Sequence, residues 1–289
     1  MENKFDDEIE GHCEREVRRE TTVLDQGFLD DKIEPLVNAT IKKYSNIFQL
    51  VFKINEFCYR CVSSITKNKI SEDKLYVSTM LGEIHNSYQS SILLIQRGLA
   101  NDAQILMRSI FEKAFKLVAV SKDEKNLLRA IDDSKAHSNK IYNVIMNKEY
   151  MSYLRGKADS FKQNGIYKET STEDWAKLAG MSELYDSAYR TLSQYTHLDI
   201  KILSNNIIKK DDGIILDYNI NYKDIKFNIL VLIDIMIEVL EAYINVNEFD
   251  KLRKELTNIK DEKEALNNDG AFDDSPLDTA ENSRIVIMN

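Results

Sequence analysis

The sequence predicts an all-α protein, a helical bundle with one small β-hairpin near residues 205–220. The chain has only 9 Gly and 2 Pro among its 289 residues, too few for the many turns of a large sheet. Hydrophobic residues make up 43% of the chain, and most of them recur at helical spacing. We therefore expect a charged leader over residues 1–31, one helical domain over residues 32–259, and an acidic disordered tail over residues 260–289.

Three long amphipathic helices are expected in the first half of the chain. The first runs from Ile33 to about Lys67, and the second begins at Ser71 and stops at Arg97-Gly98. The third, AQILMRSIFEKAFKLVAV, opens just after Asn101-Asp102 and is apolar around most of its circumference. A helix with that pattern is buried on most sides, so we expect it to form the centre of the bundle.

The second half of the chain predicts shorter elements with longer loops. Asp212-Gly213 lies between two β-branched runs, which is typical of a tight hairpin turn. The remaining expected elements are helices at about 123–149 and 151–163, a short polar connection holding Trp175, a helical segment from Met181 to about Leu203, and one helix from about Lys223 to Leu256.

The charge of the chain is concentrated at its ends. The net charge is −9, but residues 1–34 carry −7, residues 260–289 carry −5, and the body between them carries +3. This distribution allows a polyanionic ligand at the body, while the acidic ends could contact a partner protein. No apolar signal-peptide stretch and no membrane-length apolar run occurs, so we expect a cytoplasmic protein without membrane contact.

The cysteines and the common motifs predict no metal or cofactor site. Cys58 and Cys61 form a C-x-x-C pair, but the second ligand pair that zinc requires is missing, and the pair lies in a helical pattern. Both are expected to be ordinary helix cysteines. Sequence motifs of nucleotide triphosphatases, zinc proteases, serine hydrolases and EF-hands are also absent.

Arg108 and Glu112 are a charged pair on the most apolar helix. Their spacing of four residues places them on one helix face, where they can pair with each other. Burying a charge without a partner is unfavourable by several kcal/mol. We therefore expect either an internal salt bridge that ties helices together or a cavity that admits a ligand.

Three further residues could carry chemistry. His197 lies seven positions after Arg190, so on a helix the two return to within about 20° of one face and lie about 10 Å apart along the axis. Arginine can grip a phosphate while histidine acts as acid or base. The alternative is a solvated arginine and a histidine that caps a helix end. His85 lies on an apolar stripe of the second expected helix. It is interpreted either as a core histidine or as a second catalytic or phosphate-contacting imidazole.

Two stretches of the sequence resemble a bacterial family known as domain of unknown function 5677. They are SILLIQRGLANDAQILMRSIFEKAFKLVAV and the later YRTLSQYTHLD. The resemblance covers roughly residues 75–200, and its most specific elements are Arg108, Ser109, Phe111, Glu112, Ser193 and His197. It implies an all-helical core but no established activity. Ser193 joins Arg108, Glu112 and His85 as a candidate for a ligand-binding site or polar network.

The chain is also similar, more loosely, to the HEPN superfamily of helical domains. Nuclease members carry an arginine followed by four to six residues and a histidine, which Arg190 and His197 match. In them, the motifs of two protomers face each other and cleave RNA without metal, so the resemblance implies a HEPN-like bundle and a homodimer. The residue after the arginine is Thr191, where the family usually has a more polar residue.

Two hypotheses of function follow. The first is a HEPN-like, metal-independent ribonuclease, acting as a toxin or phage-defence effector with Arg190 and His197 as its catalytic residues and no cofactor. The second is a non-catalytic interaction or nucleotide-sensing protein in which Arg108, Glu112 and His197 form a buried polar network. The ligand is accordingly RNA in the first case, and a nucleotide or a partner protein in the second.

Overall fold

The computed structural model describes residue 29 and residues 33–64, 71–123, 125–142, 169–196, 207–210, 213–216 and 222–272. These residues are mostly helical, so the all-α prediction is confirmed. The predicted leader and the predicted helix at 151–163 lie outside the described residues, apart from residue 29. None of the helices in these ranges combines the length and apolarity that a membrane crossing requires.

The first expected helix is two helices. Helix α2 spans Ile33–Lys43 and α3 spans Ser45–Ser63, with a turn at Tyr44 between them. In the last turn of α2, the Thr40 hydroxyl donates a hydrogen bond to the backbone oxygen of Leu36, 3.0 Å away. Such bonds from a side chain to the preceding turn bend helices, which accounts for the break.

Helices α4 (Glu72–Gln96) and α5 (Ala100–Lys122) form an antiparallel pair at the centre of the bundle. Gly98 ends α4 with a φ of 80°, in the left-handed region that glycine adopts without strain. The next backbone N–H, at Leu99, closes the turn by donating to the oxygen of Leu94. Helix α5 buries residues on most of its sides, as its apolar pattern predicts.

Trp175 lies in a helix, so its predicted place in a polar connection is wrong. Helix α8 spans Thr172–Ala179, and the Trp175 side chain is only 1% exposed. The Ser171 hydroxyl accepts a hydrogen bond from the Asp174 N–H at the start, and Gly180 ends the helix with a φ of 69°. Both are standard cap signals and were readable in the sequence. Before α8, α6 covers Lys125–Tyr142.

The segment after α8 contains an irregular helix. A short turn of helix, α9 (Ser182–Leu184), leads into a π-helix, η2 (Tyr185–Tyr189), and then into α10 (Arg190–Thr196). In a π-helix the backbone bonds span five residues, and the Arg190 N–H donates to the oxygen of Tyr185. Farther along, strand β1 (Ile207–Lys210) pairs antiparallel with β2 (Gly213–Leu216).

The last expected helix is also two helices. Helix α12 spans Tyr222–Asn247 and α13 spans Asp250–Asn268. Between them Glu248 has a φ of 57°, a left-handed conformation that reverses the chain, so that α13 packs back on α12 and α3. Residues 260–268, assigned to the acidic tail from sequence, are therefore helical, and residues 273–289 lie outside the described residues.

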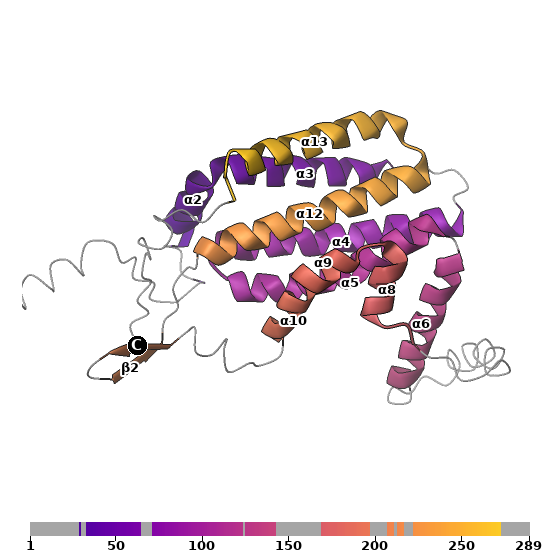
Figure 1. Ribbon diagram of the computed structural model, residues 1–289, viewed down its shortest axis with the longest axis horizontal. Helices are drawn as coiled ribbons and strands as arrows, with labels where there is room; N and C mark the ends of the chain where they lie inside the picture. The colour runs from indigo at the N-terminus through magenta and orange to yellow at the C-terminus, as the bar shows by residue number, and fades with distance from the viewer. Residues whose placement is uncertain are drawn as a thin grey trace, which may run out of the picture.

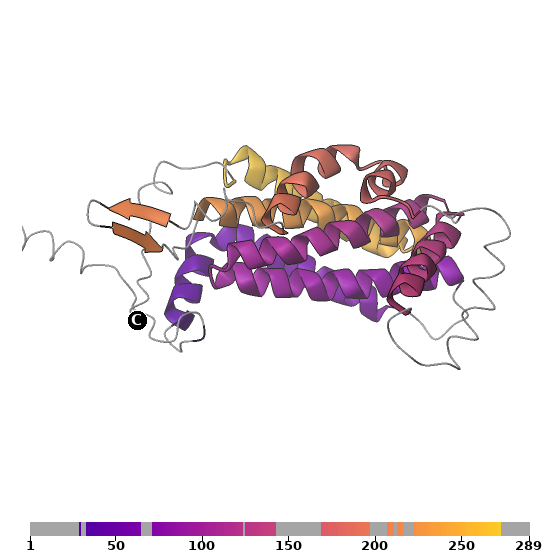
Figure 2. The same ribbon diagram turned by 90° about the horizontal axis from the view of Figure 1, so that it is seen from below.

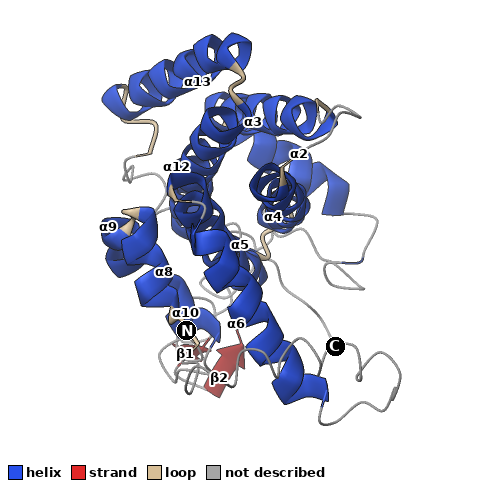
Figure 3. Ribbon diagram, turned by 90° about the vertical axis from the view of Figure 1, so that its right-hand side faces the viewer, coloured by secondary structure: helices blue, strands red, loops and turns tan. Residues whose placement is uncertain are grey.

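Helices α3, α4, α5, α12 and α13 lie lengthwise beside one another, and α6 crosses one end of them (Figure 1). The two strands lie apart from the helices at the opposite end, as the view from below also shows (Figure 2). Seen end-on, α4 lies on one side of α5 and the α8–α10 segment on another (Figure 3). This arrangement matters for function because α10 packs directly on α5.

Candidate functional site

A polar cluster joins α5 to the π-helix. On α5, Arg108 Nε donates to Glu112 Oε1 at 3.2 Å. The Tyr189 hydroxyl, at the end of η2, donates to the same carboxylate oxygen at 2.8 Å and lies 3.3 Å from Arg108 Nε. The spacing of four residues on α5 aims both charged side chains at one neighbour, which proves to be Tyr189.

The cluster lies between α5 and the π-helix and is only partly buried. The Arg108 side chain is 25% exposed and that of Glu112 is 40% exposed, whereas Tyr189 as a whole is 6% exposed. The expected salt bridge between Arg108 and Glu112 is present, but the expectation that it is internal is wrong. Arg108 and Glu112 lie on the face of α5 that meets the edge of the α8–α10 segment, which explains why the most apolar helix carries charge there.

The protonation states of the cluster are fixed by its surroundings. Burial, and then the hydrogen bond to Glu112, raise the pKa of the Tyr189 phenol, so it stays protonated and acts as a donor. Burial lowers the pKa of Arg108, but its hydrogen bonds with Tyr189 and Glu112 more than offset this, and the pKa is raised. Arg108 is therefore a permanent cation.

Ring contacts connect this cluster to Arg190. The rings of Tyr185 and Tyr189 are stacked with their centroids 5.1 Å apart. The Arg108 guanidinium lies 5.7 Å from the centre of the Tyr189 ring, and that of Arg190 lies 5.4 Å from the centre of the Tyr185 ring. Two arginines from distant parts of the chain thus share one pair of tyrosine rings, in contacts that are typical of cation–π interactions.

Arg190 is the more solvent-accessible of the two arginines. Its side chain is 61% exposed, and its Nε pairs with the Asp186 carboxylate at 3.0 Å. The residue after it, Thr191, donates its hydroxyl to the backbone oxygen of Ser187 at 2.8 Å, so this hydroxyl is held within its own helix. Ser193 is partly buried on α10. His197, the predicted partner of Arg190, lies outside the described residues.

His85 lies elsewhere. It is 5% exposed on α4, and its Nε2 lies 2.8 Å from Asn55 Oδ1 on α3. Burial lowers the pKa of His85 and the bond to Asn55 only partly offsets this, so the imidazole is neutral at pH 7. Because α4 turns this side chain toward α3, it does not join Arg108 and Glu112, and the core interpretation fits its surroundings.

The two helix cysteines are buried thiols. Cys58 and Cys61 are both free and fully buried on α3. Burial raises the pKa of both thiols, to about 12 for Cys61, and a protonated thiol is a poor nucleophile and metal ligand. Within the described ranges, no three His, Cys, Asp or Glu side chains gather as a metal site would require.

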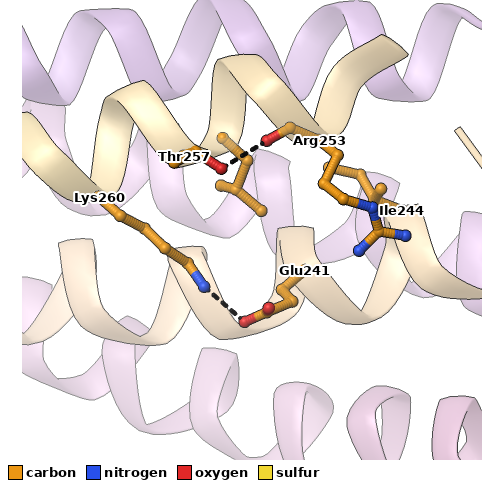
Figure 4. A pocket seen from close by; sticks show the side chains of 6 residues that line it. Glu241, Ile244, Arg253, Thr257 and Lys260 are labelled. Carbon is orange, nitrogen blue, oxygen red and sulfur yellow. Dashed lines mark hydrogen bonds and ion pairs between the residues drawn. The ribbon is translucent and has the colours of Figure 1, made fainter. Parts of the chain in front are cut away.

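A small hollow lies between α12 and α13, away from the cluster. Its volume is about 30 Å³, and it is lined by Glu241, Ile244, Arg253, Leu256, Thr257 and Lys260. Lys260 reaches across it to Glu241, with the Nζ and the carboxylate oxygen 2.7 Å apart (Figure 4). Ligand pockets usually measure about 300–1,000 Å³, so this hollow does not hold a nucleotide.

Sequence reasoning missed Tyr185 and Tyr189, which link the two groups of predicted residues. One signal is present in the sequence, because Tyr189 is the first residue of the stretch YRTLSQYTHLD that carries the family resemblance. Chemically, the assembled group offers two guanidinium cations for anion binding and a phenol as hydrogen-bond donor. Its carboxylates, on Glu112 and Asp186, hold these groups in place.

Comparison with known proteins places these residues in one family. No curated protein and no solved structure shows significant similarity to the chain. A family match covers residues 74–214, which include most of α4 and the whole of α5, the π-helix and α10. The cluster residues Arg108, Glu112 and Tyr189, together with Arg190, all fall inside it. Residues 74–214 of this chain belong to DUF5677, a family of unknown function.

Proposed function

We propose that the protein is a HEPN-like, metal-independent endoribonuclease that acts in a bacterial toxin or phage-defence setting. In this proposal the His197 imidazole takes the proton from a ribose 2′-hydroxyl, whose oxygen then attacks the adjacent phosphorus. The bond from phosphorus to the 5′-oxygen breaks, and that oxygen takes up a proton from water, which leaves a 2′,3′-cyclic phosphate and a free 5′-hydroxyl. Arg190 stabilises the negative charge that builds up on the phosphate oxygens. The working form is a cytoplasmic homodimer whose two motifs face each other, and the acidic ends contact a partner protein.

The observation that carries the proposal is the placement of Arg190. Its side chain is 61% exposed at the start of α10, the short helix that leads toward His197. A cation that binds a phosphate has to be accessible to solvent. It must also be held in position, so that little conformational entropy is lost on binding. The Asp186 carboxylate and the Tyr185 ring supply that support.

RNA cleavage by purified protein in the presence of a metal chelator tests the proposal. We expect wild type to cut RNA, and both Arg190→Ala and His197→Ala to lose at least about 100-fold in rate, as enzymes do when one charge-stabilising or proton-transferring group is removed. A matched control is Arg253→Ala, which removes a 51% exposed arginine that also pairs with a nearby aspartate, Asp250, on α13. This control should cut RNA at the wild-type rate.

A second function is favoured by one observation. Arg108, Glu112 and Tyr189 satisfy one another across the α5–π-helix seam, as a structural network in a non-catalytic interaction or sensor protein would. In that case wild type leaves RNA intact under all conditions, and His197→Ala lowers the melting temperature by several degrees. Intact RNA with wild type would therefore refute the nuclease proposal and favour this second function.

A further inference from the structure

Tyr189 occupies the junction between the bundle and the exposed arginine. It is the last residue of the π-helix and directly precedes Arg190. Its ring packs edge-on against Phe115 of α5, with the centroids 6.0 Å apart, and its hydroxyl donates to Glu112 at 2.8 Å. This side chain therefore attaches the π-helix to α5 through both an apolar and a polar contact.

Arg190, in contrast, is supported from within its own segment. Its ion pair is with Asp186 at 3.0 Å, and its ring contact is with Tyr185. Both partners belong to the π-helix, so these contacts fix the guanidinium relative to the π-helix. The π-helix in turn meets α5 through Tyr189 and through Tyr185, whose ring centroid lies 6.2 Å from that of Phe115. The place of Arg190 in the molecule therefore depends in part on how the π-helix is attached to α5.

The hydrogen bond from Tyr189 to Glu112 fixes the orientation of the π-helix on α5 as well as strengthening the attachment. An aromatic contact such as that of Tyr189 with Phe115 tolerates rotation and sliding, whereas a hydrogen bond is directional and weakens steeply away from its preferred angle. The bond from Tyr189 to Glu112 is charge-assisted, which makes it stronger than a bond between neutral groups. π-helical turns also occur frequently at functional sites.

We infer that Tyr189 is a positioning residue of the proposed nuclease site, and that its hydroxyl bond to Glu112 holds the π-helix, and with it Arg190, in register against α5. This inference rests on the proposed function, because it assigns Tyr189 a part in the same reaction. Tyr189 does not touch the substrate. It acts through Arg190, and the phenol takes no part in proton transfer.

The variant Tyr189→Phe tests the inference, because it keeps the ring and its packing but removes the hydroxyl. We expect kcat for RNA cleavage to fall about tenfold with KM little changed, since a displacement of about 1 Å in a catalytic group can reduce the rate about 100-fold. The melting temperature should fall by no more than about 4 °C, because the hydroxyl's hydrogen bonds with Glu112 and Arg108 are partly exposed. Backbone amide exchange in residues 185–196 should become faster.

Two further variants separate positioning from general destabilisation. Glu112→Gln keeps an oxygen that accepts from Tyr189, so it should retain most of kcat, whereas Glu112→Ala should match Tyr189→Phe. Tyr59→Phe is the control, because it removes a hydroxyl from a tyrosine that is 63% exposed on α3. It should change neither kcat nor amide exchange in residues 185–196.

Each outcome points one way. Slower turnover together with faster exchange in residues 185–196 supports the inference. Unchanged kcat in Tyr189→Phe, with an active wild type, overturns the inference and leaves the proposed function standing. A parallel loss in Glu112→Gln also overturns it, because the carboxylate charge would then be needed for something other than holding Tyr189. If wild type does not cut RNA, the proposed function fails, and the assigned role of Tyr189 fails with it.

Discussion

Replacing Asp133 tests how the α8–π-helix segment is anchored to the bundle. Asp133 lies on α6 and is 3% exposed. Its two carboxylate oxygens each accept a hydrogen bond at 2.9 Å, one from the indole N–H of Trp175 on α8 and one from the backbone N–H of Thr170. The polypeptide that carries Tyr189 and Arg190 starts at this point of attachment.

The expected loss of stability follows from these two bonds. Asp133→Ala leaves the Trp175 indole N–H, which is buried with its 1% exposed side chain, without this acceptor. An unsatisfied buried donor destabilises by about 1–3 kcal/mol, and the partly buried Thr170 N–H adds a smaller amount. We expect the free energy of unfolding to fall by about 2–4 kcal/mol. Asp133→Asn retains one acceptor oxygen and should lose about half as much.

Urea denaturation followed by circular dichroism measures these changes. Trp175 is the single tryptophan of the chain, so Trp175→Phe can be combined with Asp133→Ala in a double-mutant cycle that does not depend on fluorescence. We expect a coupling of about 1–3 kcal/mol between the two positions. Glu173→Gln, which alters a 45% exposed carboxylate on α8 that pairs with Lys177, is the control and should lower stability by no more than about 0.5 kcal/mol.

Two results would refute this reasoning. A loss below about 0.5 kcal/mol in Asp133→Ala would mean that water replaces the carboxylate without penalty, so that the site is not sealed. A coupling near zero with Trp175→Phe would mean that the indole bond contributes nothing specific, even if each single variant is destabilised. Either would leave the α8 segment attached by apolar packing alone.

Two further predictions concern His85 and Gly180. Burial lowers the pKa of His85, so as pH falls the unfolded chain takes up this proton first. The free energy of unfolding should therefore decrease as pH drops below about 6.5. Urea titrations at several pH values should show a weaker pH dependence for His85→Gln, and an unchanged pH dependence would contradict the buried, neutral state of His85. At Gly180, φ is 69° and an added Cβ would lie 2.8 Å from Lys122 Nζ, so Gly180→Ala should destabilise by about 1–2 kcal/mol. Gly82→Ala is its control, because a Cβ there meets nothing within 4 Å inside a helix; it should stabilise by about 0.5–1 kcal/mol, and equal effects at both glycines would refute the strain argument.

Helices with a strong period and clear end signals could be predicted from the sequence. The α4–α5 pair shows this best, because Gly98 marks the turn and α5 is apolar on most of its sides. Both signals act through contacts a few residues apart, so they do not depend on the rest of the chain. The helix around Trp175 was missed even though Ser171 and Gly180 cap it locally.

The breaks within long helical patterns were not predictable in the same way. At Glu248 a non-glycine residue adopts a left-handed conformation, and apolar periodicity continues on both sides of it. The strain of that residue is offset by the packing of α13 on α12 and α3, which local propensity does not contain. The π-helix before Arg190 is likewise set by what Tyr189 meets on α5.

The sequence by itself determined the helical class, the central place of α5, and the pairing of Arg108 with Glu112, because each depends on residues no more than a few turns apart. Only the tertiary structure decided that Tyr189 completes this pair, that the two arginines share one pair of tyrosine rings, and that His85 turns away toward α3. Tyr189 and Glu112 are 77 residues apart in the chain. Contacts at that range are chosen by which helix faces pack together, and a helical period shows that a face is apolar without showing which other face will cover it.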